Sequence, residues 1–173
     1  MEADLDTAVK LEIYRTVAAT ARIPSASEVA RALTLGNPGG QGAGGAGGES
    51  GGAGSVAGVD VEAVLAAFGR LGSKRLLVAE PGDPSRIRMA PPFSGVPTPF
   101  SVEIGDRTYF ANCVWDALGV AAALHADAVV RAADGFTGEP MSIEIERGAP
   151  VPAECVIHFA VPAARWWDDI LYT

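Results

Sequence analysis

Two side chains that could do chemistry, Cys113 and Asp116, lie three residues apart at the start of a predicted helix. The apolar run Val114–Leu124 has helical length, and Asn112 just before it is a candidate N-cap. Residues three apart share a helix face, so we expect the thiol and the carboxyl to point into the same space. The unpaired N–H groups of a first helical turn favour a thiolate, which is a nucleophile and a soft metal ligand, and the neighbouring carboxyl can move a proton. The alternative interpretation is a buried structural cysteine beside a capping aspartate.

Other candidate residues give weaker signals. Cys155 opens an apolar segment, which favours a buried and inert thiol. His158 follows in the same segment and His125 is the only other histidine, so a zinc site is not expected without closer Cys or His spacing. The segment Trp166–Asp169, with two tryptophans followed by two aspartates, either lines an apolar pocket or caps the edge of a sheet.

The helix after Cys113 must be held by the elements around it. A hairpin is predicted before it, with strands Ser101–Ile104 and Arg107–Phe110 around Gly105-Asp106. Further strands are predicted after it at 128–131, 141–146 and 155–161. The proline-rich segment 90–99 is expected to be an extended connector. The C-terminal half is therefore predicted to be α+β, a small mixed sheet packed on a helix.

The N-terminal half has the pattern of three helices followed by two short strands. The spacing of apolar residues and a Pro-Gly-Asp-Pro turn predict helices at 5–21, 27–33 and 59–71 and strands at 74–79 and 86–89. Asp60 is a candidate cap of the third helix, and Gly72 lies just past its expected end. This order predicts a winged-helix-like region. Residues 36–58 hold twelve glycines and are expected to be a disordered insertion. We therefore divide the chain into residues 1–92 and 93–173.

Charge is distributed unevenly along the chain. Residues 1–92 carry nine Lys/Arg and ten Asp/Glu, whereas 93–173 carry four and eleven, so DNA contact is possible only through the N-terminal half. There the third predicted helix offers Arg70 as its one cation, which favours a scaffold over a DNA-binding helix. No apolar run approaches the ~20 residues that span a bilayer. The acidic start is unlike a signal peptide, and two cysteines make no disulfide framework, so a cytoplasmic location is expected.

Three segments of the C-terminal half resemble the organomercurial lyase (alkylmercury lyase) family in order and spacing. They are FSVEIGDRTYFANCVWDALGVAAAL, the TGEPMSIEIE segment 137–146, and VIHFAVPAARWWDDILYT. The resemblance runs from about Phe100 to the C-terminus, and its most specific parts are Cys113-x-x-Asp116 after a Tyr-Phe strand and the Thr137–Pro140 turn. It implies a winged-helix-like N-terminal region that serves structure. It also implies that the segment around Trp166 lies beside the active site.

The resemblance further implies a chemistry. Cys113 would be a mercury ligand and Asp116 the proton shuttle in the protonolysis of a carbon–mercury bond, with no organic cofactor. The substrate would be a small organomercurial, and Hg(II) would pass to low-molecular-weight thiols or to a mercuric reductase. Mercury is bound in this family by two cysteines, and the second is expected in a segment beyond Thr173, which would make this chain truncated. A free thiol could then supply the second sulfur. The alternatives are a non-catalytic mercury- or metal-binding relative and a winged-helix transcriptional regulator with a metal-sensing domain.

Overall fold

The computed structural model describes residues 2–36, 58–151 and 156–171. It divides into two compact units, one of Met1–Ala19 with Ile23–Arg88 and the other of Thr20–Arg22 with Met89–Thr173. Most of the glycine-rich segment expected to be disordered, and Cys155, lie outside the described residues. None of the described helices is long and apolar enough to cross a membrane.

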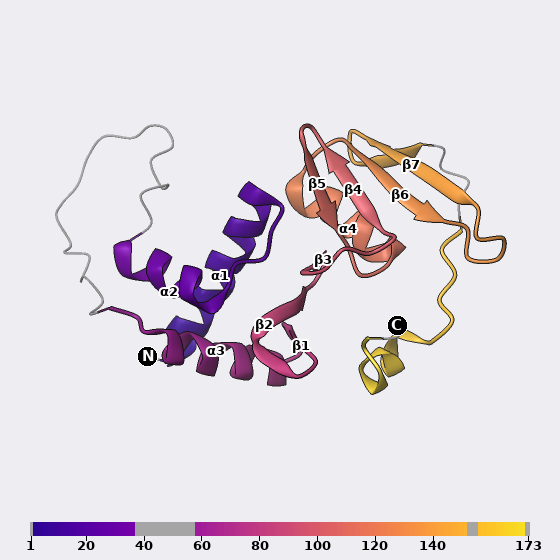
Figure 1. Cartoon of the computed structure of the whole chain (residues 1–173). Coiled ribbons are helices and arrows are strands. Elements are labelled where there is room, and N and C mark those ends of the chain that lie inside the picture. Colours follow the sequence, from indigo (N-terminus) through magenta and orange to yellow (C-terminus); the bar gives the residue numbers. More distant parts are fainter. Residues whose placement is uncertain (1, 37–57, 152–155, 172–173) are drawn as a thin grey trace. The chain divides into compact units, whose positions relative to one another are not determined.

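The first unit contains three helices and a β-wing, in the predicted order (Figure 1). The elements are α1 (Glu2–Thr20), α2 (Ala26–Leu35), α3 (Val61–Ser73), β1 (Val78–Glu80) and β2 (Asp83–Ala90). The last two residues of β2, Met89 and Ala90, belong to the second unit. The apolar residues Val9, Ile13 and Val17 recur at helical spacing in α1 and are at most 2% exposed. From α3, Val64 and Leu71 are buried in the same way. Helical periodicity therefore identified the core of this unit.

Local hydrogen bonds explain where α2 and α3 begin. A capping box starts α2, since Ser25 Oγ accepts from the Glu28 N–H and the Ser25 N–H donates to Glu28 Oε2 at 2.8 Å. Asp60 caps α3 as predicted, its Oδ1 accepting from Ala63 N–H at 2.7 Å. The predicted end of α3 before Gly72 is wrong. The helix runs to Ser73 because Arg75, with φ 60°, is the residue that turns the chain left-handed.

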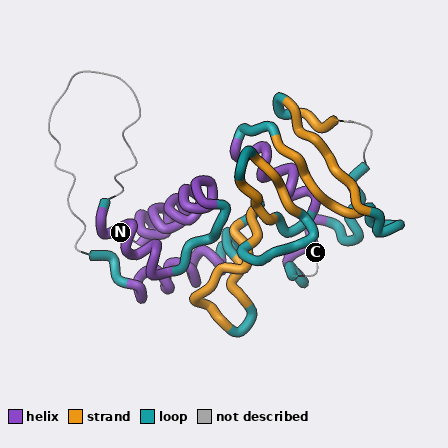
Figure 2. Tube along the Cα trace, turned by 45° about the horizontal axis from the view of Figure 1, so that its top comes forward, coloured by secondary structure: helices purple, strands orange, loops and turns teal. Residues whose placement is uncertain are grey.

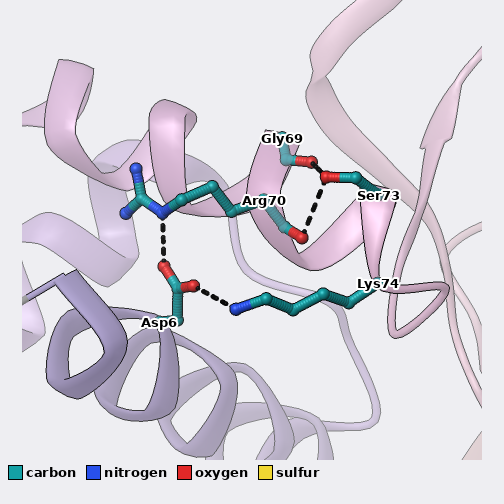
Figure 3. Close-up of polar contacts among 5 residues, drawn as sticks. All are labelled: Asp6, Gly69, Arg70, Ser73 and Lys74. Atoms are coloured by element: carbon teal, nitrogen blue, oxygen red, sulfur yellow. Dashed lines mark hydrogen bonds and ion pairs between the residues drawn. The ribbon is translucent and has the colours of Figure 1, made fainter.

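A buried carboxylate joins α1 to the end of α3 (Figure 3). Asp6 accepts from Arg70 Nε at 2.8 Å and from Lys74 Nζ at 2.9 Å, and its own side chain is 6% exposed. The hydrogen bonds from Lys74 and Arg70 hold the pKa of Asp6 below its usual value, against the effect of burial. Both cations at the C-terminal end of α3 therefore have a partner inside the unit.

The second unit is built on a five-stranded sheet of order β5-β4-β6-β7-β8. Its strands are β4 (Ser101–Ile104), β5 (Arg107–Phe110), β6 (Ala128–Ala133), β7 (Pro140–Glu146) and β8 (Ala149–Val151). The prediction of an α+β fold is confirmed. All four pairings are antiparallel, so the expectation of a mixed sheet is wrong. The reason is that the helix after β5 returns the chain to the far side of β4, where β6 pairs antiparallel to it.

Helix α4 (Val114–Leu124) lies against one face of this sheet (Figures 1 and 2). Its inner residues and the sheet residues facing them form one apolar core: Val102, Tyr109, Ala117, Val120, Ala121, Val130, Ile143 and Ile145. The connector before β4 contains the short strand β3 (Phe93–Ser94), which pairs with the end of β2. A Cβ placed on Gly119 of α4 would lie 3.2 Å from the Cβ of Pro92, so connector and helix are in close contact.

The C-terminal segment departs from the prediction. The part of the expected strand 155–161 that is described, 156–161, has no regular secondary structure, and a 3-10 helix follows at Ala163–Asp168. The outer position beside β7 is taken instead by β8, which follows a turn with positive φ at Arg147 (52°) and Gly148 (79°). The strand predicted at 155–161 is therefore wrong for its described part: β8 pairs with β7, and Phe159 packs its ring against Trp115 of α4 instead.

Candidate functional site

The start of α4 places a thiol at the N-cap itself. Cys113 has extended backbone angles (φ −153°, ψ 178°), and its Sγ accepts from the Asp116 N–H at 3.5 Å. The prediction that Asn112 is the N-cap is therefore wrong by one residue. Either residue can present an acceptor to the first turn, and sequence spacing does not decide between them. The predicted helix bounds Val114–Leu124 are confirmed.

Asn112 instead contacts the carboxyl of the pair. Its Nδ2 donates to Asp116 Oδ2, four residues later in the chain, in a partly buried hydrogen bond of 2.9 Å. The structure therefore joins Asn112, Cys113 and Asp116 in one hydrogen-bonded turn. The sequence did not predict this contact, because the Asn112 side chain was expected to accept a hydrogen bond from a backbone N–H as the N-cap of the helix.

Burial governs the ionisation of both groups. Withdrawal from water raises the pKa of the Cys113 thiol, and the nearby Asp116 charge raises it further, against the N–H groups of Asp116 and Trp115. The expectation that the first helical turn favours the thiolate is therefore wrong: its N–H groups lower the pKa of Cys113, but the net change is upward. Burial also raises the pKa of Asp116, and the hydrogen bond from Asn112 lowers it in part. Near neutral pH the thiol holds its proton, and the carboxyl is a stronger base than an exposed one.

Aromatic side chains connect α4 to the C-terminal segment. Trp115 meets Phe159 edge-on with ring centroids 6.0 Å apart, and Phe159 lies 5.3 Å from Trp166. The Trp166 Nε1–H donates to the Val161 carbonyl at 2.8 Å. Trp115 is 53% exposed and Phe159 42%, so the cluster presents apolar surface to solvent. The sequence pattern indicated the Trp166 segment but did not indicate that Phe159 would link Trp166 to Trp115 of α4.

The other candidate residues do not join this turn. His158 is exposed, and His125 is the C-cap of α4, at the opposite end of the helix from Cys113. Within residues 2–36, 58–151 and 156–171, no group of three or more His, Cys, Asp or Glu side chains could hold a metal ion. Cys155 lies outside this part of the chain. The chemistry that the described site offers is therefore that of one thiol, one carboxyl and one amide.

One family of known proteins matches the stretch of the chain that contains this pair of groups. Residues 93–173 match the family model of the alkylmercury lyases (MerB). This stretch is similar to the alkylmercury lyase family. The resemblance on which the sequence analysis rested is thereby confirmed for this part of the chain. Comparison with curated proteins finds no match.

Among solved structures, the chain is similar to a crystal structure of the mercury-bound form of MerB2. The two are 27% identical, with a TM-score of 0.44, over 53% of this chain and 44% of that chain. The match thus spans less than half the length of the MerB2 chain.

Proposed function

We propose that this protein is an organomercurial lyase, which cleaves a carbon–mercury bond by protonolysis to give a hydrocarbon and Hg(II). The observation that carries the proposal is the Cys113–Asp116 pair at the start of α4, inside the stretch that matches the alkylmercury lyase family. A soft thiolate suits soft mercury, and a carboxyl of raised pKa suits proton transfer near neutral pH.

The proposed steps conserve atoms and charge. The organomercury cation displaces the proton of the Cys113 thiol, forming an S–Hg bond, and Asp116 accepts that proton. The carboxyl then returns the proton to the mercury-bound carbon. Both electrons of the C–Hg bond stay with the carbon, a C–H bond forms, and mercury remains Hg(II) without any redox change. Sulfur donation to mercury makes the carbon more carbanion-like and easier to protonate.

Mercury release needs a second thiol. We propose that the second sulfur comes from a free thiol or from Cys155, the other cysteine of this sequence. We propose low-molecular-weight thiols or a mercuric reductase as acceptors of Hg(II), and a reducing, cytoplasmic setting that keeps the thiols free. The reaction as proposed uses no organic cofactor.

The test is benzene release from phenylmercury, with and without excess free thiol. Release above the thiol background is expected from the wild-type chain, and loss of release is expected in Cys113→Ala and Asp116→Ala. Asp106→Ala, which removes an exposed carboxyl from the β4–β5 turn, is the matched control and should keep full release. Cys155→Ala separates the two sources of the second sulfur. Its release should be normal with excess thiol if a free thiol suffices, and lost if Cys155 is required.

If the wild-type chain released no more benzene than free thiol alone does, the lyase proposal would be refuted. If mercury were still retained through Cys113, the protein would be a metal-binding relative without turnover. Equal mercury affinity in Cys113→Ala would exclude that alternative as well.

We also propose that the first unit is a scaffold that does not read DNA. Three of its cations have carboxylate partners, since Arg70 and Lys74 bind Asp6, and Arg88 binds Glu80 at 3.2 Å. A DNA-binding helix needs cations that can reach phosphates. An electrophoretic shift assay at low salt should show at most weak, salt-sensitive binding. Tight binding to one promoter sequence would instead favour a transcriptional regulator.

A further inference from the structure

The backbone next to the site is fixed before the helix begins. The Ala111 N–H donates to the Phe100 carbonyl at 2.9 Å, and Thr98 Oγ1 donates to the Ala111 carbonyl at 2.6 Å. Ala111 is fully buried. On the other side of Asn112, Cys113 is tied to the first turn of α4. Hydrogen bonds at Ala111 and Cys113 therefore fix the backbone on both sides of Asn112, which carries the side-chain amide.

This fixed amide contacts one oxygen of the carboxyl. Asn112 Nδ2 lies 2.9 Å from Asp116 Oδ2. An ionised carboxylate only accepts hydrogen bonds, so the NH₂ of the amide is the group that must face it. A proton on Oδ2 would compete with this N–H for the same oxygen. The hydrogen bond therefore favours Oδ1 over Oδ2 as the oxygen that carries an acidic proton, and it restrains rotation of the carboxyl group.

Resting on the proposed lyase function, we propose that Asn112 is a positioning residue, which occupies Asp116 Oδ2 and leaves Oδ1 as the oxygen that carries the proton to the substrate carbon. The contact serves both protonation states of Asp116. The ionised carboxylate accepts from the amide before the thiol proton arrives. The neutral acid still accepts through its carbonyl oxygen, Oδ2, while the O–H on Oδ1 is directed to carbon. Asn112 itself touches no reacting atom in this scheme.

The test uses Asn112→Asp, which keeps the shape of the side chain but removes the donor, and Asn112→Ala, which removes the side chain beyond Cβ. With phenylmercury as probe, both variants should lower kcat by about tenfold or more, with KM and the capture of phenylmercury by Cys113 unchanged. Asn112→Asp should be the slower of the two, because it also places a like charge beside Asp116. A purely structural role would instead raise KM and lower thermal stability together. Wild-type kcat in Asn112→Asp would overturn the proposal.

A second measurement does not depend on turnover. In a ¹⁵N–¹H spectrum, the side-chain NH₂ signals of Asn112 should move in Asp116→Ala and stay unchanged in the control Asp106→Ala. Unmoved signals would overturn the positioning contact even if the chain is an active lyase. Moved signals together with no benzene release from the wild-type chain would instead show that the contact exists and that the lyase function has failed, and a role in proton delivery would fall with it.

Discussion

Replacing a helical glycine by alanine at two positions, Gly119 of α4 and Gly69 of α3, tests how closely α4 packs against the connector before β4. Gly119 contacts that connector, and Gly69 is the control. Both glycines lie inside helices, where alanine is more favourable than glycine by about 1 kcal/mol. Their surroundings differ. A Cβ on Gly69 meets nothing within 4 Å, whereas a Cβ on Gly119 lies 3.2 Å from Pro92 Cβ and 3.7 Å from Pro92 Cγ. Atoms of a proline ring cannot move aside by changing rotamer.

The magnitudes follow from these surroundings. Gly69→Ala should stabilise the first unit by about 1 kcal/mol. Gly119→Ala gains the same helix preference but forces two packed segments apart, which costs about 1–3 kcal/mol. The net effect on the second unit is therefore between zero and about 2 kcal/mol of destabilisation. The difference between the two variants isolates the contact with Pro92.

The assay can follow each unit separately. All three tryptophans lie in the second unit, so urea unfolding followed by tryptophan fluorescence reports Gly119→Ala. Far-ultraviolet circular dichroism, dominated by the three helices of the first unit, reports Gly69→Ala. If Gly119→Ala stabilised its unit as much as Gly69→Ala does, the reasoning about close packing of α4 would be refuted.

Three further predictions concern charge and exposure. Asp6→Asn should destabilise the first unit by about 2 kcal/mol at pH 7, since it leaves two cations without their carboxylate. Because the pKa of Asp6 is lowered on folding, this contribution is present above the ordinary carboxyl pKa and lost as pH falls, so urea unfolding should show the two proteins converging in acid. The rate of alkylation of Cys113, measured by mass spectrometry of its peptide, should rise at a higher pH than that of a free cysteine. In Asp116→Asn this rise should shift to lower pH, and an unshifted pH profile would contradict the electrostatic account. Phe136→Ser should change unfolding by less than about 0.5 kcal/mol, because the ring is 98% exposed; a larger loss would mean that the ring is packed.

The sequence predicted the parts of the fold that rest on periodicity and short turns. The hairpin around Gly105-Asp106 has the predicted bounds, because Gly105 adopts a positive φ (59°) that its residue type allows. The strand 141–146 was recognisable because Ile143 and Ile145 face the core between exposed glutamates. Such patterns are local, and the structure agrees closely with the strands that they predicted here.

Features that depend on distant partners were not predictable in this way. Strand β8 follows a turn in which Arg147 adopts φ 52°, a conformation that arginine rarely takes, so no turn signal marked it. The apolar segment 155–161 was predicted to be a strand, but its described part, 156–161, has no regular secondary structure, and β8 takes the position beside β7. At the site, spacing predicted that Cys113 and Asp116 would meet. It could not predict that burial would outweigh the helix N-terminus in setting the thiol pKa.

Burial has complementary consequences for the two groups of the site. For Cys113 it raises the thiol pKa, so the sulfur keeps its proton until a soft metal displaces it. For Asp116 it raises the carboxyl pKa, so the ionised group becomes a better acceptor for that same proton. In the proposed reaction, withdrawal from water therefore couples thiol deprotonation to loading of the carboxyl, and the proton that leaves sulfur is the one delivered to carbon. In a more exposed turn with the same two residues, the carboxylate would be a weaker acceptor for the proton that mercury displaces from sulfur.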